Sequence, residues 1–134
     1  TITGVAQMLK TARPEIKVIC TEPEGAQMLT KNEWQPHKIQ GWTPDFIPKV
    51  LDTKYIDQII PISDVLARDT AIKLATQEGI FCGISAGATF AGALELTKSL
   101  PKHSASILVM LPDTGERYMS TFLFENIEDG TDEL

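Results

Sequence analysis

The sequence contains little of what several classes of protein require. Only two cysteines and two histidines occur among 134 residues. Two cysteines make no disulfide framework, and no Cys, His or carboxylate cluster shows the spacing of metal ligands. No apolar run approaches the roughly 20 residues that a membrane span needs. Basic residues are also fewer than acidic ones: the sequence has 12 Lys and Arg and 18 Asp and Glu, which gives a net charge of −6. Nucleic acids and anionic membranes attract the opposite sign, so we expect neither as a partner.

The rest of the composition is that of an ordinary globular protein. Hydrophobic residues make up 43% and charged residues 22%, which excludes a disordered chain. The length suits one domain, and free cysteines fit the reducing cytoplasm. The chain begins at Thr1, without an initiator Met and with a helical pattern already under way. We therefore expect it to be the later part of a longer protein.

The apolar pattern predicts an α/β fold with a mostly parallel sheet, because segments typical of strands alternate with segments typical of helices. One predicted helix ends before Pro14. A second is capped by Ser63 and ends before Gly79, and a third runs to about Leu100. The predicted strands or extended segments are 16–21, 55–62, 80–82 and 106–111. The last of these, SILVML, is typical of a strand covered on both faces. Residues 25–50 are expected to be irregular.

The most informative stretch is GIFCGISAGATFAG, residues 79–92, in which a short strand meets a glycine-rich turn that opens a helix. Ligands bind at such junctions in parallel sheets, where the helix directs free N–H groups at them. We predict Ser85 at the N-cap of this helix. Two other interpretations remain open: Ser85 only caps the helix while the glycines permit close packing, or GISAG belongs to a serine hydrolase. Neither His37 nor His103 has an acidic partner at a suggestive position.

Two further segments carry candidate groups. Residues 111–118, LPDTGERY, follow the apolar run and form either a polar turn at the site or a plain β-turn. Thr1 precedes a helix and is therefore an N-cap, an anion ligand or both. Cys20 and Cys82 are expected to be small buried hydrophobic residues, and we predict no metal site. The aromatic run Trp34, Trp42 and Phe46 is expected to fold over the domain's own core.

Five motifs in order, TITGV, PHKIQG, DFIP, EGIFCGISAGA and LPDTGERYMST, resemble the C-terminal part of cysteine synthases (O-acetylserine sulfhydrylases). The resemblance implies the tryptophan-synthase β-like fold, also called pyridoxal-phosphate fold type II. This is a three-layer α/β fold, incomplete here, whose mostly parallel sheet has helices on both faces. The resemblance extends over residues 1–125, the cofactor-binding part, and residues 126–134 are expected to form an acidic, flexible tail.

The resemblance also implies roles for a few residues around pyridoxal 5'-phosphate. Thr1 matches the last residue of the loop that binds the cofactor's phosphate, and Ser85 matches the serine whose hydroxyl meets the pyridine nitrogen. Gly41 resembles part of the loop that lines the amino-acid side. Asp113 and Thr114 match a turn near the ring that supports the Ser85 contact. A neutral hydroxyl disfavours protonation of the ring nitrogen, which favours loss of a β-substituent.

The activity implied is synthesis of L-cysteine from O-acetylserine and sulfide, by β-elimination to an aminoacrylate and then addition. Members of the family are usually homodimers, and some bind the C-terminal peptide of serine acetyltransferase. The family's Schiff-base lysine lies before the region covered, so this chain holds no catalytic residue and is expected to be inactive alone.

The sequence also departs from the family pattern at WTPDFIP, residues 42–48, which replaces a glycine-rich form common in bacterial cysteine synthases. DFIP also occurs in cystathionine β-synthases, so homocysteine stays an alternative nucleophile. Trp42 beside the expected entrance favours a small one. A non-catalytic interaction domain on the same scaffold is a further alternative.

Overall fold

Two short parallel strands form the centre of the structure, a computed structural model that describes residues 1–127. β1 (Ile19–Pro23) pairs with β2 (Gln58–Ile62) in a register that places Ile19 opposite Gln58 and Pro23 opposite Ile62. The predicted strand at 16–21 thus starts three residues later, and the extended segment at 55–62 is a strand only in its second part. The parallel pairing agrees with the predicted fold class.

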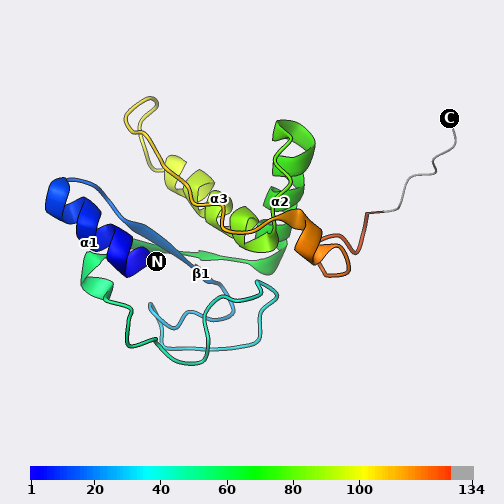
Figure 1. Cartoon of the computed structure of the whole chain (residues 1–134), viewed down its shortest axis with the longest axis horizontal. Helices are drawn as coiled ribbons and strands as arrows, with labels where there is room; N and C mark the ends of the chain where they lie inside the picture. Colours follow the sequence, from blue (N-terminus) through cyan, green and yellow to red (C-terminus); the bar gives the residue numbers. More distant parts are fainter. Residues whose placement is uncertain (128–134) are drawn as a thin grey trace, which may run out of the picture.

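Among residues 1–127, three α-helices and two short 3₁₀ helices accompany the strands (Figure 1). Their bounds are α1 (Ile2–Ala12), α2 (Asp64–Glu78), α3 (Ile84–Thr97), η1 (Thr53–Tyr55) and η2 (Gly115–Tyr118). The ends of α2 follow from local chemistry. The Ser63 hydroxyl accepts a hydrogen bond from the Leu66 N–H at 3.2 Å, and Gly79 adopts a left-handed conformation with φ 70°. Both predicted ends of this helix are confirmed.

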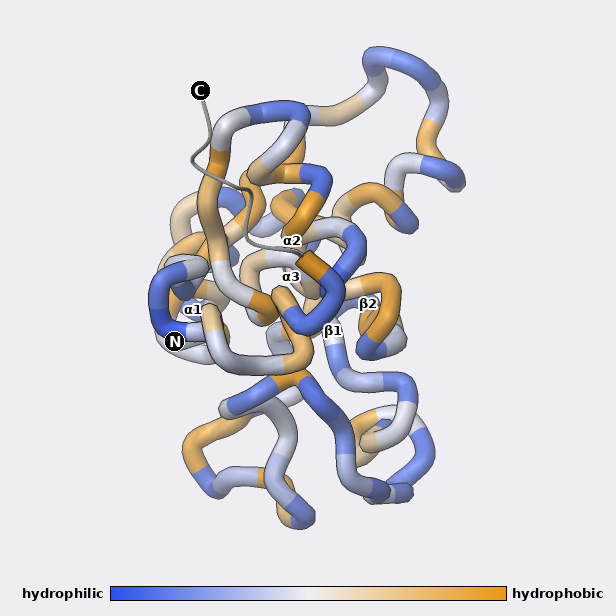
Figure 2. Tube along the Cα trace, turned by 90° about the vertical axis from the view of Figure 1, so that its right-hand side faces the viewer, coloured by the Kyte–Doolittle hydropathy of each residue, from blue (hydrophilic) through white to orange (hydrophobic). Residues whose placement is uncertain are grey.

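The core lies where α3 packs against α2 and the two strands. Small residues make this packing close: a Cβ added at Gly87 would lie 2.2 Å from the Ala67 carbonyl oxygen, and one at Gly92 would lie 2.3 Å from a Thr21 methyl. Figure 1 shows α3 between α1 and α2. In Figure 2, much of the chain where α2, α3 and β2 meet has the colour of hydrophobic residues. The position of the α3 N-terminus is therefore set by close contacts on several sides.

The prediction of a strand at residues 106–111 is wrong. Within the described residues this segment forms no strand, and Leu108 is 96% exposed. The sheet of the described part has only β1 and β2, so it offers this segment no neighbouring strand. A hydrogen bond from the Thr89 hydroxyl of α3 to the Met110 carbonyl, 2.6 Å long, ties the segment to the helix instead. Residues 80–82 likewise form only a single antiparallel bridge, between Cys82 and Thr114.

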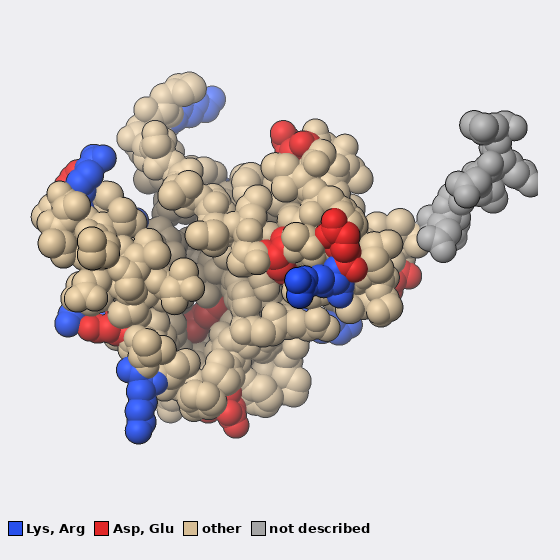
Figure 3. All heavy atoms as spheres, in the orientation of Figure 1, with Lys and Arg blue, Asp and Glu red and all other residues tan. Residues whose placement is uncertain are grey.

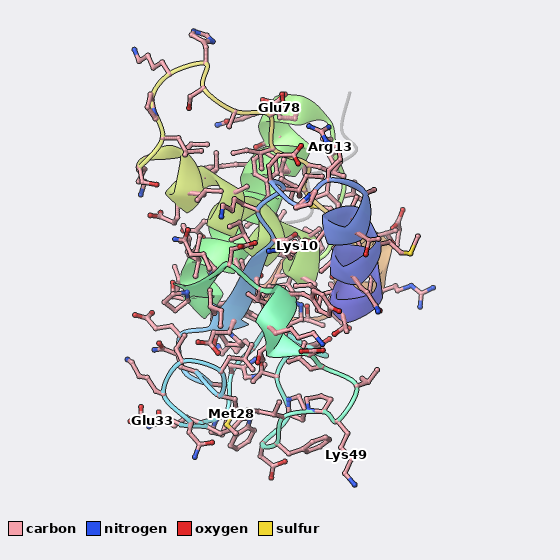
Figure 4. All side chains as sticks on the ribbon, turned by 90° about the vertical axis from the view of Figure 1, so that its left-hand side faces the viewer. Lys10, Arg13, Met28, Glu33, Lys49 and Glu78 are labelled. Carbon is pink, nitrogen blue, oxygen red and sulfur yellow. The ribbon has the colours of Figure 1, made fainter. Side chains whose placement is uncertain are left out.

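The irregular segment between β1 and η1 is confirmed and is held at its start. At its start the buried carboxylate of Glu22 accepts hydrogen bonds from the Leu29 N–H, at 3.0 Å, and from the Thr30 hydroxyl. Beyond η1, Asp57 accepts from Lys10 of α1 at 2.6 Å; Figure 4 labels this lysine, which projects from α1 towards the strands. These carboxylates link the loop and α1 to the sheet. Most of the predicted acidic tail, residues 128–134, lies outside the described part of the chain.

Candidate functional site

The N-terminus of α3 is closed by a carboxylate from a distant turn. Gly83, not Ser85, is the N-cap residue, and Ser85 is the second residue of the helix, which corrects the predicted cap. Glycine has no side chain with which to cap, and the Asp113 carboxylate takes that role. It accepts from the Ser85 N–H at 3.0 Å and from the Ala86 N–H at 2.7 Å. The turn at 111–118 and the glycine-rich stretch therefore form one site.

Gly83 is required for this contact between turn and helix. A Cβ at this position would lie 2.2 Å from Oδ2 of Asp113 and 2.4 Å from a ring carbon of Tyr118. The Gly83 N–H also donates to the Asp113 carbonyl at 3.2 Å, and the adjacent Cys82 bridges to Thr114. Backbone and side chain of Asp113 thus both hold the first turn of α3, which leaves Ser85 in one fixed place.

The Ser85 side chain faces the loop that contains Gly41. Ser85 is only 6% exposed, and its hydroxyl donates to the Gln40 carbonyl at 3.4 Å, a long hydrogen bond. Gly41 follows with φ 81°, a left-handed conformation that glycine adopts without strain. The structure therefore brings together the regions of two predicted site residues, Ser85 and Gly41, that are 44 positions apart. The hydroxyl contacts a carbonyl rather than an imidazole, so the geometry gives the serine hydrolase interpretation no support.

Thr1 occupies the N-cap position of α1, as predicted. Its carbonyl accepts from the Val5 N–H at 3.0 Å, but its side chain makes no capping hydrogen bond. The first turn of α1 contains no acidic residue, so its N–H groups and positive helix end are available to an anion. Figure 1 shows this end of α1 nearer the middle of the molecule than the other end. The described contacts do not join Thr1 to Ser85 or Gly41.

The loop after Gly41 is held in an unusual conformation. Thr43 has φ 32°, which is strained for a β-branched residue, and its carbonyl accepts from Nε1 of Trp34 at 3.0 Å and from Nε2 of His37 at 3.4 Å. Trp42 is half-buried and packs on the core, as predicted. Trp34 and Phe46, at 43% and 59% exposed, do not fold over the core, and this part of the prediction is wrong.

A cavity of about 340 Å³ lies between this loop, the start of α3 and the segment after η2. Its walls include His37, Gln40, Ile84 and Tyr118. Gln40, whose carbonyl accepts from the Ser85 hydroxyl, lines this cavity, whereas Ser85 itself is not one of its lining residues. The Nδ1 atom of His37 is buried and has no hydrogen-bond partner among the described residues. The loop with Gly41 therefore borders a space large enough for a small molecule.

Burial raises the pKa of Tyr118 and of both cysteines. The pKa of Tyr118 is raised, first by burial and then by its hydrogen bond to the Asp113 carboxylate. Burial, with the Asp113 charge as a smaller cause, also raises the pKa of Cys82. For Cys20, burial and the charge of Glu22 raise the pKa to about 11. Cys82 is buried as predicted, Cys20 is half-buried, and both thiols are in their neutral form near pH 7.

The described residues contain neither a cluster of metal ligands nor a helix that could span a membrane. No group of three His, Cys, Asp or Glu among residues 1–127 could hold a metal ion. No helix in this part of the chain has the length and apolar content to cross a membrane. On the face shown in Figure 3, acidic and basic side chains are interspersed rather than gathered into a patch of one sign.

Sequence comparison defines the class of protein to which this geometry belongs. Residues 1–113 match the family of pyridoxal-phosphate-dependent enzymes, and the chain belongs to that family. It is 53% identical over 133 residues to O-ureido-L-serine synthase from Streptomyces lavendulae, an alignment that covers 99% of this chain and 41% of that protein. It is 39% identical over 124 residues to a cysteine synthase from Staphylococcus aureus, covering 92% and 40%.

The fold is shared with solved members of this family. A crystal structure of O-ureido-L-serine synthase superimposes with a TM-score of 0.93 at 54% identity and covers 98% of this chain and 42% of that one. The fold class predicted from the sequence, pyridoxal-phosphate fold type II, is confirmed, and the described residues form a partial α/β unit of it. The chain spans about two fifths of the length of these relatives.

The groups present fit the cofactor that defines the family. Pyridoxal phosphate has an anionic phosphate at one end and a pyridine nitrogen at the other. Among the described residues no side chain caps the end of α1 at Thr1, so that end suits an anion, whereas the buried Ser85 places a neutral hydroxyl at the end of α3 that Asp113 caps. The resemblance implied that the turn of Asp113 supports the Ser85 contact, whereas the capping hydrogen bonds from Asp113 and the contact of Ser85 with Gln40 were not predicted. The sequence features that point to Asp113 and Gln40 are the polar turn after the apolar run and the motif before Gly41. Neither feature indicates which residue these two contact.

Proposed function

We propose that this chain is the C-terminal, cofactor-binding part of a pyridoxal-phosphate-dependent enzyme that replaces the β-substituent of an O-substituted serine. The observation that carries the proposal is the buried Ser85 hydroxyl at the N-terminus of α3, fixed by Asp113 in a chain of this family. Ser85 would contact the pyridine nitrogen, Thr1 the phosphate and the Gly41 loop the amino acid. When bound, the cofactor supplies an electron sink that lets the β-substituent leave.

The chain's own residues would bind and orient rather than transfer protons. Once turned from the Gln40 carbonyl, the neutral Ser85 hydroxyl would donate a hydrogen bond to the ring nitrogen and bring no negative charge, so it would not stabilise a proton there. The Gly41 loop, with its left-handed turn, would bring backbone groups close to the amino acid. The family's Schiff-base lysine has no counterpart in these motifs, and we expect the 134-residue chain alone to be inactive.

For the nucleophile, two candidates have specific support. The identity of 53% to O-ureido-L-serine synthase, against 39% to cysteine synthase, favours a ureido product. By balance of atoms, O-acetylserine and hydroxyurea would give O-ureido-L-serine and acetate. The second candidate is the cysteine synthase reaction, in which sulfide takes the place of hydroxyurea. The half-buried Trp42 packs on the core and thus gives no support to the expectation that it narrows an entrance. Homocysteine, a homodimer, the serine acetyltransferase peptide and a cytoplasmic location stay predictions.

The test uses the full-length protein that carries this chain. It should bind pyridoxal phosphate with a visible absorption band and release acetate from O-acetylserine. Mass spectrometry of the product formed with hydroxyurea or with sulfide then decides between the two candidates. S85A should lower the rate of acetate release, and S85D should lower it further, because a carboxylate favours a protonated ring nitrogen. A protein that binds no pyridoxal phosphate would refute the proposal and favour the non-catalytic alternative.

A further inference from the structure

The loop around Gly41 is closed at its base by two hydrogen bonds to one backbone carbonyl. The Thr43 carbonyl accepts from Nε1 of Trp34 at 3.0 Å and from Nε2 of His37 at 3.4 Å. Residues 38–42, which include Gly41, lie between these donors and the acceptor in the sequence. The two bonds, which we call the latch, therefore close this part of the chain into a small ring.

The latch holds Thr43 in a backbone conformation that its side chain disfavours. Thr43 has φ 32°, in the left-handed region, where a β-branched side chain is strained. A residue keeps such a conformation only where its surroundings hold it there. The loop therefore needs a stabilising contact at Thr43, and the latch supplies one.

Trp34 is the stronger of the two donors in the latch. Its distance of 3.0 Å is normal for an N–H···O hydrogen bond, whereas the 3.4 Å of His37 is long. Nδ1 of His37 is also buried without a partner among the described residues, so the placement of this ring has a cost of its own. The Trp34 side chain is 43% exposed and lies outside the hydrophobic core. Core packing does not account for its position, whereas the hydrogen bond to Thr43 does.

The segment inside the latch carries the groups that the proposed function assigns to the amino-acid side. The Trp42 N–H donates to the Ile39 carbonyl at 3.2 Å, and the Gln40 carbonyl accepts from the Ser85 hydroxyl. Gly41 lies between these contacts and only two positions before Thr43. A change in the backbone conformation of Thr43 would therefore displace the loop at Gly41.

We infer that Trp34 is a positioning residue for the amino-acid substrate: its indole N–H holds the strained Thr43 and thereby keeps the Gly41 loop in the conformation that receives an O-substituted serine. The inference rests on the proposed function and deepens it by adding a residue that acts through the Thr43 carbonyl and does not touch the substrate. Without this hydrogen bond, the strain at Thr43 would favour other conformations of the loop. Only the molecules with the loop in the latched conformation would then be ready to bind the amino acid.

The first test removes only the hydrogen-bond donor. W34F, in the full-length protein loaded with pyridoxal phosphate, keeps an aromatic ring but has no N–H. We expect the KM for O-acetylserine in acetate release to rise about fivefold, which corresponds to about 1 kcal/mol, the net contribution of one hydrogen bond. The value of kcat should change by less than about twofold, because saturating substrate restores the latched loop.

The second test removes the strain from Thr43 and leaves its carbonyl in place. Glycine adopts φ 32° without strain, so in T43G the loop depends less on the donor. W34F should therefore raise KM about fivefold in the wild-type background but by less than about twofold in the T43G background. Equal effects of W34F in both backgrounds would mean that Trp34 does not act by holding a strained Thr43, and the inference would be wrong.

N32G is the matched control for an added glycine. Asn32 also has a left-handed conformation, with φ 56°, but it contributes no hydrogen bond to the latch. N32G should therefore leave the KM for O-acetylserine unchanged. A KM in N32G that rises as much as in W34F would show that general flexibility of this segment sets KM, which contradicts a specific role of Trp34.

A readout without turnover is the exchange of the Trp34 indole N–H with solvent, followed by NMR in the wild-type protein. The signal is identified by its absence in W34F. Because this N–H is bonded to Thr43, it should exchange slowly although the side chain is 43% exposed, both without and with added L-serine, which has no acetate to release. If exchange is fast until L-serine is added, the amino acid and not Trp34 orders the loop, and the inference is wrong. This comparison also decides the question if W34F fails to fold.

Failure of this inference is distinguishable from failure of the proposed function. A wild-type protein that binds no pyridoxal phosphate refutes the proposed function and the inference with it. If the wild type binds the cofactor and releases acetate, but W34F keeps the wild-type KM or lowers kcat alone, only the role of Trp34 is refuted.

Discussion

We predict that replacing glycine by alanine has opposite effects on stability at two helical positions, Gly87 and Gly4. In G87A the new Cβ would lie 2.2 Å from the Ala67 carbonyl oxygen and 2.8 Å from the Ala71 Cβ, both on α2. Ordinary contacts need more than 3 Å, so α2 and α3 would have to separate by on the order of 1 Å. At Gly4 of α1, nothing among the described residues lies within 4 Å of the added methyl group.

These distances set the expected magnitudes. Overpacking costs about 1–3 kcal/mol or more, and backbone atoms of α2 cannot move aside as a flexible side chain would. Helix propensity favours Ala over Gly by about 1 kcal/mol at most. We expect G87A to destabilise by about 2 kcal/mol and G4A to stabilise by about 0.5–1 kcal/mol. For a chain of this size these values correspond to a Tm lower by about 8 °C and higher by about 3 °C.

Thermal and urea unfolding of both variants without cofactor provide the measurement. Gly87 lies two positions after Ser85, so G87A should also weaken binding of pyridoxal phosphate through displacement of the first turn of α3. The reasoning is refuted if G87A is as stable as G4A, since that result would mean that α2 and α3 separate without cost.

Three further predictions concern ionisation and a helix end. The Lys10 ammonium, 2.6 Å from the Asp57 carboxylate, lowers the pKa of Asp57. The ionised Asp57 therefore stabilises the folded protein above the unfolded pKa of about 3.9, and this stabilisation is lost as the pH falls through the folded pKa. D57N should lower the free energy of unfolding by about 0.5–1 kcal/mol at pH 7 and by less at pH 3, and an equal loss at both would contradict this. G79A should cost about 1 kcal/mol in urea unfolding, because φ is 70° there; an unchanged midpoint would argue against the left-handed cap. Since burial raises the pKa of Cys20 to about 11 and also that of Cys82, the folded protein should react slowly with iodoacetamide at pH 8; rapid labelling would disprove it.

The parts of the fold that local chemistry determines could be predicted from the sequence. α2 is an example, since Ser63 and Gly79 lie next to the helix ends that they define. The segment 106–111 is the opposite case. An apolar run indicates burial but does not say which partner covers it, and the described residues supply no strand beside it. The apolar run by itself therefore does not show which element this segment forms.

The candidate site shows the same limit at the level of single contacts. Ser85 was found because a glycine-rich turn opens a helix there, which is a local signal. That it is not the N-cap could not be predicted, because the capping group comes from Asp113, 28 positions away. Gln40, whose carbonyl accepts from the Ser85 hydroxyl, is 45 positions away on the other side. Contacts of such separation depend on how the turns fold onto α3, and one sequence does not encode them in a readable pattern.

The placement of charge around Ser85 explains why a hydroxyl and a carboxylate occur so close together in this site. If Asp113 faced the ring nitrogen directly, its charge would favour a proton there. The structure instead directs the carboxylate at two backbone N–H groups, which partly compensate its charge, and directs the Ser85 hydroxyl at the Gly41 loop. The negative charge thus holds the helix, and under the proposed function the neutral hydroxyl of Ser85 would turn from the Gln40 carbonyl to the ring nitrogen. A site built in this way would bind the ring firmly but keep it a weaker electron sink. A weaker electron sink is what favours β-replacement.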